Sequence, residues 1–150
     1  MAVKNNIPSQ LHDSVFNRVT IVNADGTNYK TVLAPTASDS SKESHVFSIK
    51  VTSDDTSARD SMFAINDGTN DNEEGAISVA ILQGFTVALP PLEVVANKSI
   101  PVLSRVMKDI RGNWFIVVRT GETLKVKALT TVTAAKTIVV TCFGYNFTRS

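Results

Sequence analysis

The chain has 150 residues, enough for one globular domain, and its 43% hydrophobic and 19% charged residues allow a buried core and argue against broad disorder. Its formal net charge of +1 argues against direct binding to nucleic acid through bulk electrostatics. The single cysteine, Cys142, excludes an internal disulfide framework and a multi-cysteine zinc module. No apolar run approaches the roughly 18 residues of a membrane-spanning helix, and the start lacks an apolar signal region, so we expect neither a membrane protein nor export by the general secretory route.

The near-zero total conceals an uneven distribution of charge along the chain. Residues 1–95 hold 6 Lys and Arg against 12 Asp and Glu, a net charge of −6, whereas residues 96–150 hold 9 against 2, a net charge of +7. Folding can interleave the two parts so that the difference disappears from the surface. Alternatively, it can keep them apart as two faces of opposite charge, suited to docking on like copies or on a charged scaffold.

Residues 1–12 are polar with one proline and predict an extended N-terminal arm, in which Lys4 and Ile7 are candidate contacts with a neighbouring protein. Beyond the arm, short runs rich in Val, Ile and Thr alternate with turn residues. This pattern predicts a single domain over residues 1–150, an all-β antiparallel β-sandwich of about eight or nine strands. The expected strands are Val15–Val22, Tyr29–Leu33, Val46–Thr52, Ser61–Asn66, Ile77–Ile81, Phe85–Ala88, Trp114–Arg119, Leu124–Ala128 and Thr137–Phe147.

The chain between residues 34 and 52 changes from a loop pattern to a strand pattern. Residues 34–44 are rich in Ser and low in hydrophobicity, which predicts a loop. In Val46–Thr52 the strict alternation places Phe47, Ile49 and Val51 on one face of the strand and polar residues on the other. The segment therefore predicts a half-buried strand with Phe47 on the core side.

Residues 99–112 depart from the period of two. Ser99 can cap a helix, Pro101 suits its first turn and Gly112 suits its end. Apolar residues recur here at helical spacing, at Leu103, Val106, Met107 and Ile110. The segment predicts one short basic amphipathic helix near residues 100–111, with an extended loop as the alternative.

The densest basic cluster of the chain surrounds this segment. It consists of Lys98, Arg105, Lys108 and Arg111. The cluster can be a solvated helix face, or it can be a protein interface that docks on an acidic partner surface.

Two acidic clusters are candidates for chemistry. The run from Asp67 to Glu74 holds enough oxygens to surround calcium, but it does not match the spacing of an EF-hand loop, and we interpret it as a solvated hairpin loop between Ile65 and Ile77. Asp54 and Asp55, followed by Arg59 and Asp60, predict a turn with a local ion pair. We expect no metal site from the spacing of either cluster.

The sequence carries no recognisable catalytic motif. A nucleophile needs an activating base, and the only histidines are His12 and His45, both in polar segments. There is no nucleophile elbow, zinc-protease pair, phosphate loop or dinucleotide-binding glycine motif. Cys142 shares a strand face with Ile138 and Val140 and is expected to be a buried hydrophobe, and Trp114 is expected to pack in the core or at a sheet edge. We expect a protein that is not an enzyme and needs no cofactor.

An ordered series of turn and strand segments resembles small virion proteins of tailed bacteriophages, of the kind encoded near capsid genes. The series comprises Asn23–Thr27, Val51–Asp60, Gly112–Trp114, Gly121–Lys127 and Val132–Thr137, within residues 15–147. The resemblance implies a jelly-roll-like β-sandwich that decorates or cements the capsid by binding the major capsid protein lattice and its own copies, commonly as a trimer. It also implies a place on the capsid surface of a virion made in the host cytoplasm, with no direct contact to nucleic acid or membrane.

The segment Asp71–Gly75 departs from the family pattern because it is unusually acidic and lacks the usual apolar turn. Contacts made by that loop in the family therefore cannot be carried over. Two alternative functions stay open: a neck or tail accessory protein, and a lectin-like module that binds carbohydrate or calcium.

Overall fold

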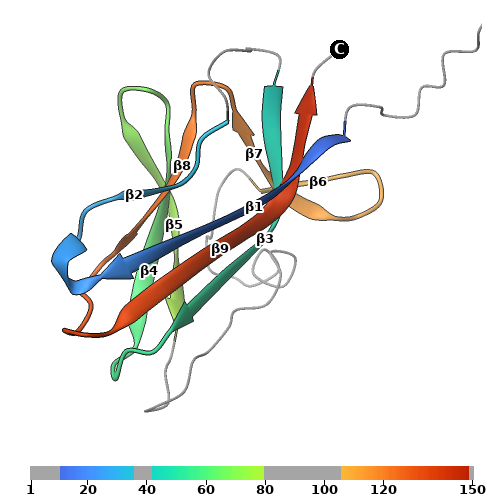
Figure 1. Cartoon of the computed structure of the whole chain (residues 1–150). Helices are drawn as coiled ribbons and strands as arrows, with labels where there is room; N and C mark the ends of the chain where they lie inside the picture. Colours follow the sequence, from blue (N-terminus) through green and yellow to red (C-terminus); the bar gives the residue numbers. More distant parts are fainter. Residues whose placement is uncertain (1–10, 36–41, 80–105, 149–150) are drawn as a thin grey trace, which may run out of the picture.

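In a computed structural model of the chain, the structure describes residues 11–35, 42–79 and 106–148, which form nine β-strands and one turn of 3-10 helix (Figure 1). The strands are β1 (Leu11–Val22), β2 (Lys30–Leu33), β3 (Lys42–Ser53), β4 (Arg59–Asn66), β5 (Asp71–Val79), β6 (Val106–Lys108), β7 (Trp114–Arg119), β8 (Thr123–Ala128) and β9 (Thr137–Thr148). The 3-10 turn, η1, spans Asn23–Asp25. The strand expected at Phe85–Ala88 lies outside the described residues.

The strands form two antiparallel sheets that share one core, which confirms the predicted β-sandwich. Sheet A has the order β1-β9-β3-β7-β6, and sheet B has the order β2-β8-β4-β5. The pairs are nested, because β1 pairs with β9, β2 with β8, β3 with β7 and β4 with β5. Four nested pairs shared between two sheets define a jelly roll. Figure 1 shows β1, β9 and β3 running side by side in sheet A.

Apolar side chains from alternate strand positions, most of them aliphatic, fill the space between the sheets. Ile21, Ile49 and Ile138 come from sheet A, and Phe63 and Leu124 come from sheet B. Each is essentially inaccessible to solvent, and burial of one such side chain stabilises the fold by about 1.5–3 kcal/mol. Phe63 is the one phenylalanine that the structure describes in this core cluster.

The helix predicted near residues 100–111 is wrong where the structure describes it. Val106–Lys108 is the strand β6, which pairs with β7. The carboxylate of Asp109 then accepts hydrogen bonds from the backbone N–H groups of Arg111 and Asn113, both at 2.8 Å, and closes a hairpin turn. An aspartate that bonds the backbone of its own turn competes with helix formation, and the neighbouring strand satisfies the remaining backbone groups.

The predicted arm and the two predicted loops end or begin at other residues than expected. The arm predicted over residues 1–12 ends sooner, since β1 begins at Leu11. The loop predicted over residues 34–44 ends before Lys42, the first residue of β3. The hairpin loop predicted between Ile65 and Ile77 is short, because β5 already begins at Asp71. In each case polar residues continue a strand by pairing their backbone with a neighbouring strand, which composition alone does not reveal.

A β-bulge in β3 reverses the predicted face of Phe47. The register of β3 against β9 shifts directly after Val46, so Val46 and Ile49 are both buried in the core and Phe47 between them lies on the outer face. Gly144 lies opposite Val46, and a Cβ atom on Gly144 would lie only 2.8 Å from the backbone carbonyl carbon of His45. Glycine therefore permits the close approach of the two strands at the bulge.

The acidic and basic parts of the chain are interleaved within the described residues. The basic strand β8 lies between β2 and β4, and β9 lies between β1 and β3. On sheet B, Lys125 Nζ lies 3.2 Å from Asp71 Oδ1 and Lys127 Nζ lies 2.7 Å from Glu73 Oε1. The interleaved alternative therefore holds here, and the hypothesis of two faces divided at residue 95 does not.

Candidate functional site

Aromatic side chains gather on the outer face of sheet A. On β9 the side chains of Ile138, Val140 and Cys142 are buried in the core, so the odd-numbered residues of this strand point to the opposite face. Phe143 on that face lies directly opposite Phe16 of β1. We use the name aromatic face for this set of residues on four adjacent strands: Phe16, His45, Phe47, Phe115, Phe143, Tyr145 and Phe147.

The rings of the aromatic face contact one another across the strands. Phe16 and Phe143 meet edge to face with ring centroids 4.9 Å apart, and Phe47 lies 5.5 Å from Phe115 and 6.0 Å from Tyr145. Such pairs stabilise a structure by about 0.5–1.5 kcal/mol beyond the area that they bury. The contacts therefore hold the rings in defined positions on the surface.

The aromatic face remains partly open to solvent. Phe16 is 62% exposed and Tyr145 is 41% exposed. Five of the seven phenylalanines of the chain belong to this face, whereas Phe63 is in the core. Phe115 is buried, so Phe16 and Tyr145 form most of the apolar surface that is open on this face. Exposed apolar rings on a folded surface are typical of an interaction site, because their exposure to water is unfavourable.

His45 is part of this face. Its ring lies 4.7 Å from the ring of Phe115 in a stacked arrangement and 4.2 Å from that of Phe147, centroid to centroid. Its Nε2 atom lies 2.8 Å from Oε1 of Glu43. The His45 ring thus packs against two phenylalanine rings and bonds to the Glu43 carboxylate, although His45 belongs to a polar segment of the sequence. The side chain of His12 lies outside the described part of the chain.

The outer face of sheet B has a different character, because its charges are paired with one another. Lys127 Nζ lies 4.4 Å above the ring of Tyr29 and donates to Glu73 Oε1, which also accepts a hydrogen bond of 2.9 Å from the Tyr29 hydroxyl. The hydrogen bond from Lys127, followed by that from Tyr29, lowers the pKa of Glu73. Burial, followed by the bond to Glu73, raises the pKa of Tyr29. The charged and polar groups of this cluster thus bond to one another.

The predicted ion pair in the turn after β3 is confirmed, and it is deeply buried. The Asp55 carboxylate is inaccessible to solvent and lies 2.8 Å from Arg59 Nε. It also accepts hydrogen bonds from the backbone N–H of Thr133 at 2.8 Å and from the Thr133 hydroxyl at 2.7 Å. Asp54 accepts a bond of 2.7 Å from the backbone N–H of Thr137. The cluster joins the β3–β4 turn to the β8–β9 connection and is structural.

The second acidic cluster is also engaged within the fold. Asp67 Oδ1 accepts hydrogen bonds from the backbone N–H groups of Thr69 at 2.9 Å and Asn70 at 2.8 Å, and the bond from Asn70 contributes most to lowering the pKa of Asp67. Asp71 and Glu73 belong to the ion pairs on sheet B. Over the described residues, no group of three or more His, Cys, Asp or Glu side chains is placed to hold a metal ion.

The predicted basic interface is described only in part. Lys108 Nζ lies 5.3 Å from the ring centroid of Trp114, which is half-buried at the start of β7, beside the edge strand β6. Arg111 is exposed in the β6–β7 turn. These two residues are brought together on one hairpin. The other four predicted interface residues, Lys4, Ile7, Lys98 and Arg105, lie outside the described residues.

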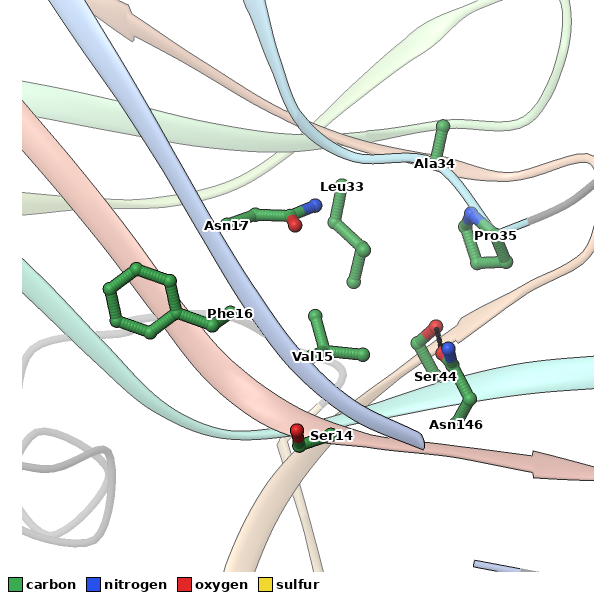
Figure 2. A pocket seen from close by; sticks show the side chains of 9 residues that line it. All are labelled: Ser14, Val15, Phe16, Asn17, Leu33, Ala34, Pro35, Ser44 and Asn146. Atoms are coloured by element: carbon green, nitrogen blue, oxygen red, sulfur yellow. Dashed lines mark hydrogen bonds between the residues drawn. The ribbon is translucent and has the colours of Figure 1, made fainter. Parts of the chain in front are cut away.

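A pocket of about 340 Å³ lies at the seam between the sheets, lined by residues of β1, β3 and β9 and by the end of β2 (Figure 2). Inside it, the Ser44 hydroxyl donates a hydrogen bond of 2.6 Å to Asn146 Oδ1. Asn17 Nδ2 donates one of 3.1 Å to the carbonyl of Val32 and thereby links the edge strands of the two sheets. Ser44 and Asn146 thus bond to each other, and Asn17 bonds to the backbone of β2.

Cys142 is fully buried, as predicted, and burial raises the pKa of its thiol. Within the described segments, no helix has the length and apolar character needed to cross a membrane.

Comparison of the chain with protein-family models, with curated proteins and with solved structures finds no match in any of the three. The geometry alone therefore selects the candidate site, and the strongest candidate is the aromatic face. The sequence analysis missed this face because its residues come from four strands.

Proposed function

We propose that this chain is a non-enzymatic structural protein of a tailed-bacteriophage virion, which decorates or cements the capsid by binding the major capsid protein lattice and its own copies. The observation that carries the proposal is the aromatic face, an apolar surface on the outside of a sandwich whose other outer face is charged and internally paired. A surface of this kind suits lasting contact with another protein.

The fold and the sequence resemblance support the same function. Jelly rolls are common in viral capsid proteins, although they also occur in lectins, so the fold alone does not decide between the two. A decoration protein needs a stable scaffold and a complementary surface. The buried Asp55 cluster and the apolar core provide the stable scaffold, and the aromatic face provides the complementary surface.

The test is reconstitution with shells assembled from the major capsid protein encoded by the same genome. We expect the chain to sediment with the shells at a fixed ratio, and electron microscopy of the complex to show added density on the outer surface at defined symmetry axes. Light scattering on the chain alone reports its self-association, for which we expect a trimer. A strictly monomeric chain that does not sediment with the shells would refute the proposal.

A carbohydrate-binding module is the second candidate, because Phe16 and Tyr145 are exposed rings of the kind on which sugars stack. Calcium gains no support from the acidic hairpin, where Asp67, Asp71 and Glu73 are engaged by backbone and lysine donors. A glycan array with the intact chain distinguishes the two functions. Specific glycan signal that is lost in Tyr145→Ser would favour the lectin-like module over the capsid protein.

A further inference from the structure

The aromatic face carries positive charge at one end. Arg18 of β1 and Lys50 of β3 lie on either side of Thr141 of β9. Arg18 and Thr141 are two residues along their strands from Phe16 and Phe143. With a strand spacing of about 4.8 Å, the backbones of Arg18 and Lys50 lie about 10 Å apart. Both side chains are exposed, and the ion pairs found among the described residues include neither of them.

The other end of the face adds a third cation. Arg119 of β7 is exposed and lies in register with Glu43 of β3. Glu43 is already engaged with His45, 2.8 Å away. Of the charged side chains that the structure describes around this face, Arg18, Lys50 and Arg119 are positive. Glu43 is negative, and so is Glu122, whose Oε2 accepts a hydrogen bond of 3.0 Å from the backbone N–H of Arg119. The face is therefore an apolar centre with a net positive rim.

We propose that the aromatic face docks on an acidic protein surface with apolar side chains at its centre, and that this surface belongs to the capsid shell. The inference rests on the virion function proposed above and specifies the chemistry of the partner. Burial of Phe16 and Tyr145 supplies the apolar contact, and carboxylates of the partner neutralise Arg18 and Lys50. Such charge complementarity also orients the partner during encounter.

A second copy of the chain fits this face less well. In a symmetric dimer the same patch occupies both sides of the interface, so two positively charged rims would meet. In a head-to-tail contact with sheet B, the carboxylates met would include Asp71 and Glu73, which already pair with Lys125 and Lys127, and Asp60 and Glu74, which are also engaged. Contacts between copies are therefore expected to use other surfaces.

A nucleic acid fits less well for a geometric reason. Binding along a phosphate backbone uses a continuous track of cations, with bases stacked on open ring faces. Here two cations stand at one end, and the ring of Phe16 packs against Phe143 with an interplanar angle of 69°. The arrangement suits a compact protein patch with acidic groups at its rim.

The experiment is a titration of the full chain against shells of the same virus's major capsid protein, with bound protein measured after sedimentation. The test variants are Arg18→Glu/Lys50→Glu and Phe16→Ser. The matched control is Lys136→Glu, a charge reversal in the β8–β9 connection away from this face. We expect the double charge reversal to weaken binding by about 100-fold, Phe16→Ser by about 10-fold, and the control by less than about 2-fold.

The outcomes separate the possible occupants. If the unchanged chain does not bind shells, the virion function itself fails and the inference falls with it. If the chain binds and the test variants bind equally well, the capsid protein uses another surface and the inference is wrong. It is also wrong if the charge reversal instead abolishes self-association in light scattering, or abolishes binding of poly(dT). Unchanged circular dichroism and urea midpoints show that the variants fold.

Discussion

Replacing Asp55 with alanine is expected to remove a large share of the stability of the sandwich. The carboxylate is inaccessible to solvent and receives donors from Arg59 Nε, from the backbone and hydroxyl of Thr133, and from the backbone of Ser57, at 2.7–3.2 Å. Since Thr133 lies 78 residues further along the chain, the carboxylate ties the β3–β4 turn to the β8–β9 connection.

The magnitude follows from what the substitution leaves behind. Alanine removes the acceptor but keeps the Arg59 side chain, which is only 12% exposed, and two donors of Thr133. Removal of one partner of a buried ion pair costs about 3–5 kcal/mol, because the other charge stays buried without compensation. The total free energy of unfolding of a domain is about 5–15 kcal/mol, so the variant would lose about a fifth of it or more.

The assay is urea unfolding, followed by circular dichroism and by the fluorescence of the single tryptophan, Trp114. The matched control is Asp67→Ala, which removes an exposed turn carboxylate with backbone donors and no ion pair and is expected to shift the midpoint much less. The double variant Asp55→Ala/Arg59→Ala should cost less than the sum of the single variants. A loss of less than about 1 kcal/mol in Asp55→Ala would refute the reasoning.

The same cluster predicts the response to acid. Burial raises the pKa of Asp55, but the hydrogen bonds from Arg59, Thr133 and Ser57 together outweigh burial and hold the pKa well below its usual 3.8. The stability that Asp55 contributes is therefore fully present above the pKa of the unfolded chain and is lost as the pH falls from about 4 toward the lower pKa of the folded state. Unfolding free energies measured between pH 6 and pH 2 should fall less steeply in Asp55→Ala than in the unchanged chain.

Three further predictions concern other parts of the fold. Gly144→Ala should destabilise the chain by about 3 kcal/mol in urea unfolding, since the new Cβ would press on the backbone of His45; a loss below about 1 kcal/mol would contradict the close approach at the bulge. Cys142 should resist thiol reagents in the folded chain and react fully in urea, because it is buried and its pKa is raised; rapid modification of the native chain would disprove this. Lys127→Ala should lower the urea midpoint only slightly, and the difference from the unchanged chain should shrink in 1 M salt, where exposed ion pairs are screened.

Local signals in the sequence account for most of the strands. Trp114–Arg119 has the predicted bounds, and Cys142 lies on the core side of its strand as expected, because a period of two needs no knowledge of the rest of the fold. Turn residues predict the ends of strands for a similar reason. The predicted helix failed at Val106–Lys108, where apolar residues at helical spacing were too few to outweigh pairing with β7 and the turn formed by Asp109.

The sequence by itself determined an all-β sandwich without catalytic motifs, since alternation and turn chemistry are local properties of the chain. Only the tertiary structure decided which residues form the candidate site. Phe16, Phe115 and Phe143 come from three strands far apart in sequence, and the order β1-β9-β3-β7 brings them to one surface. Phe47 joins them because a bulge shifts its register by one residue, which reverses the face of a side chain in a strand. The pairing of distant strands, which periodicity does not encode, places the aromatic rings together.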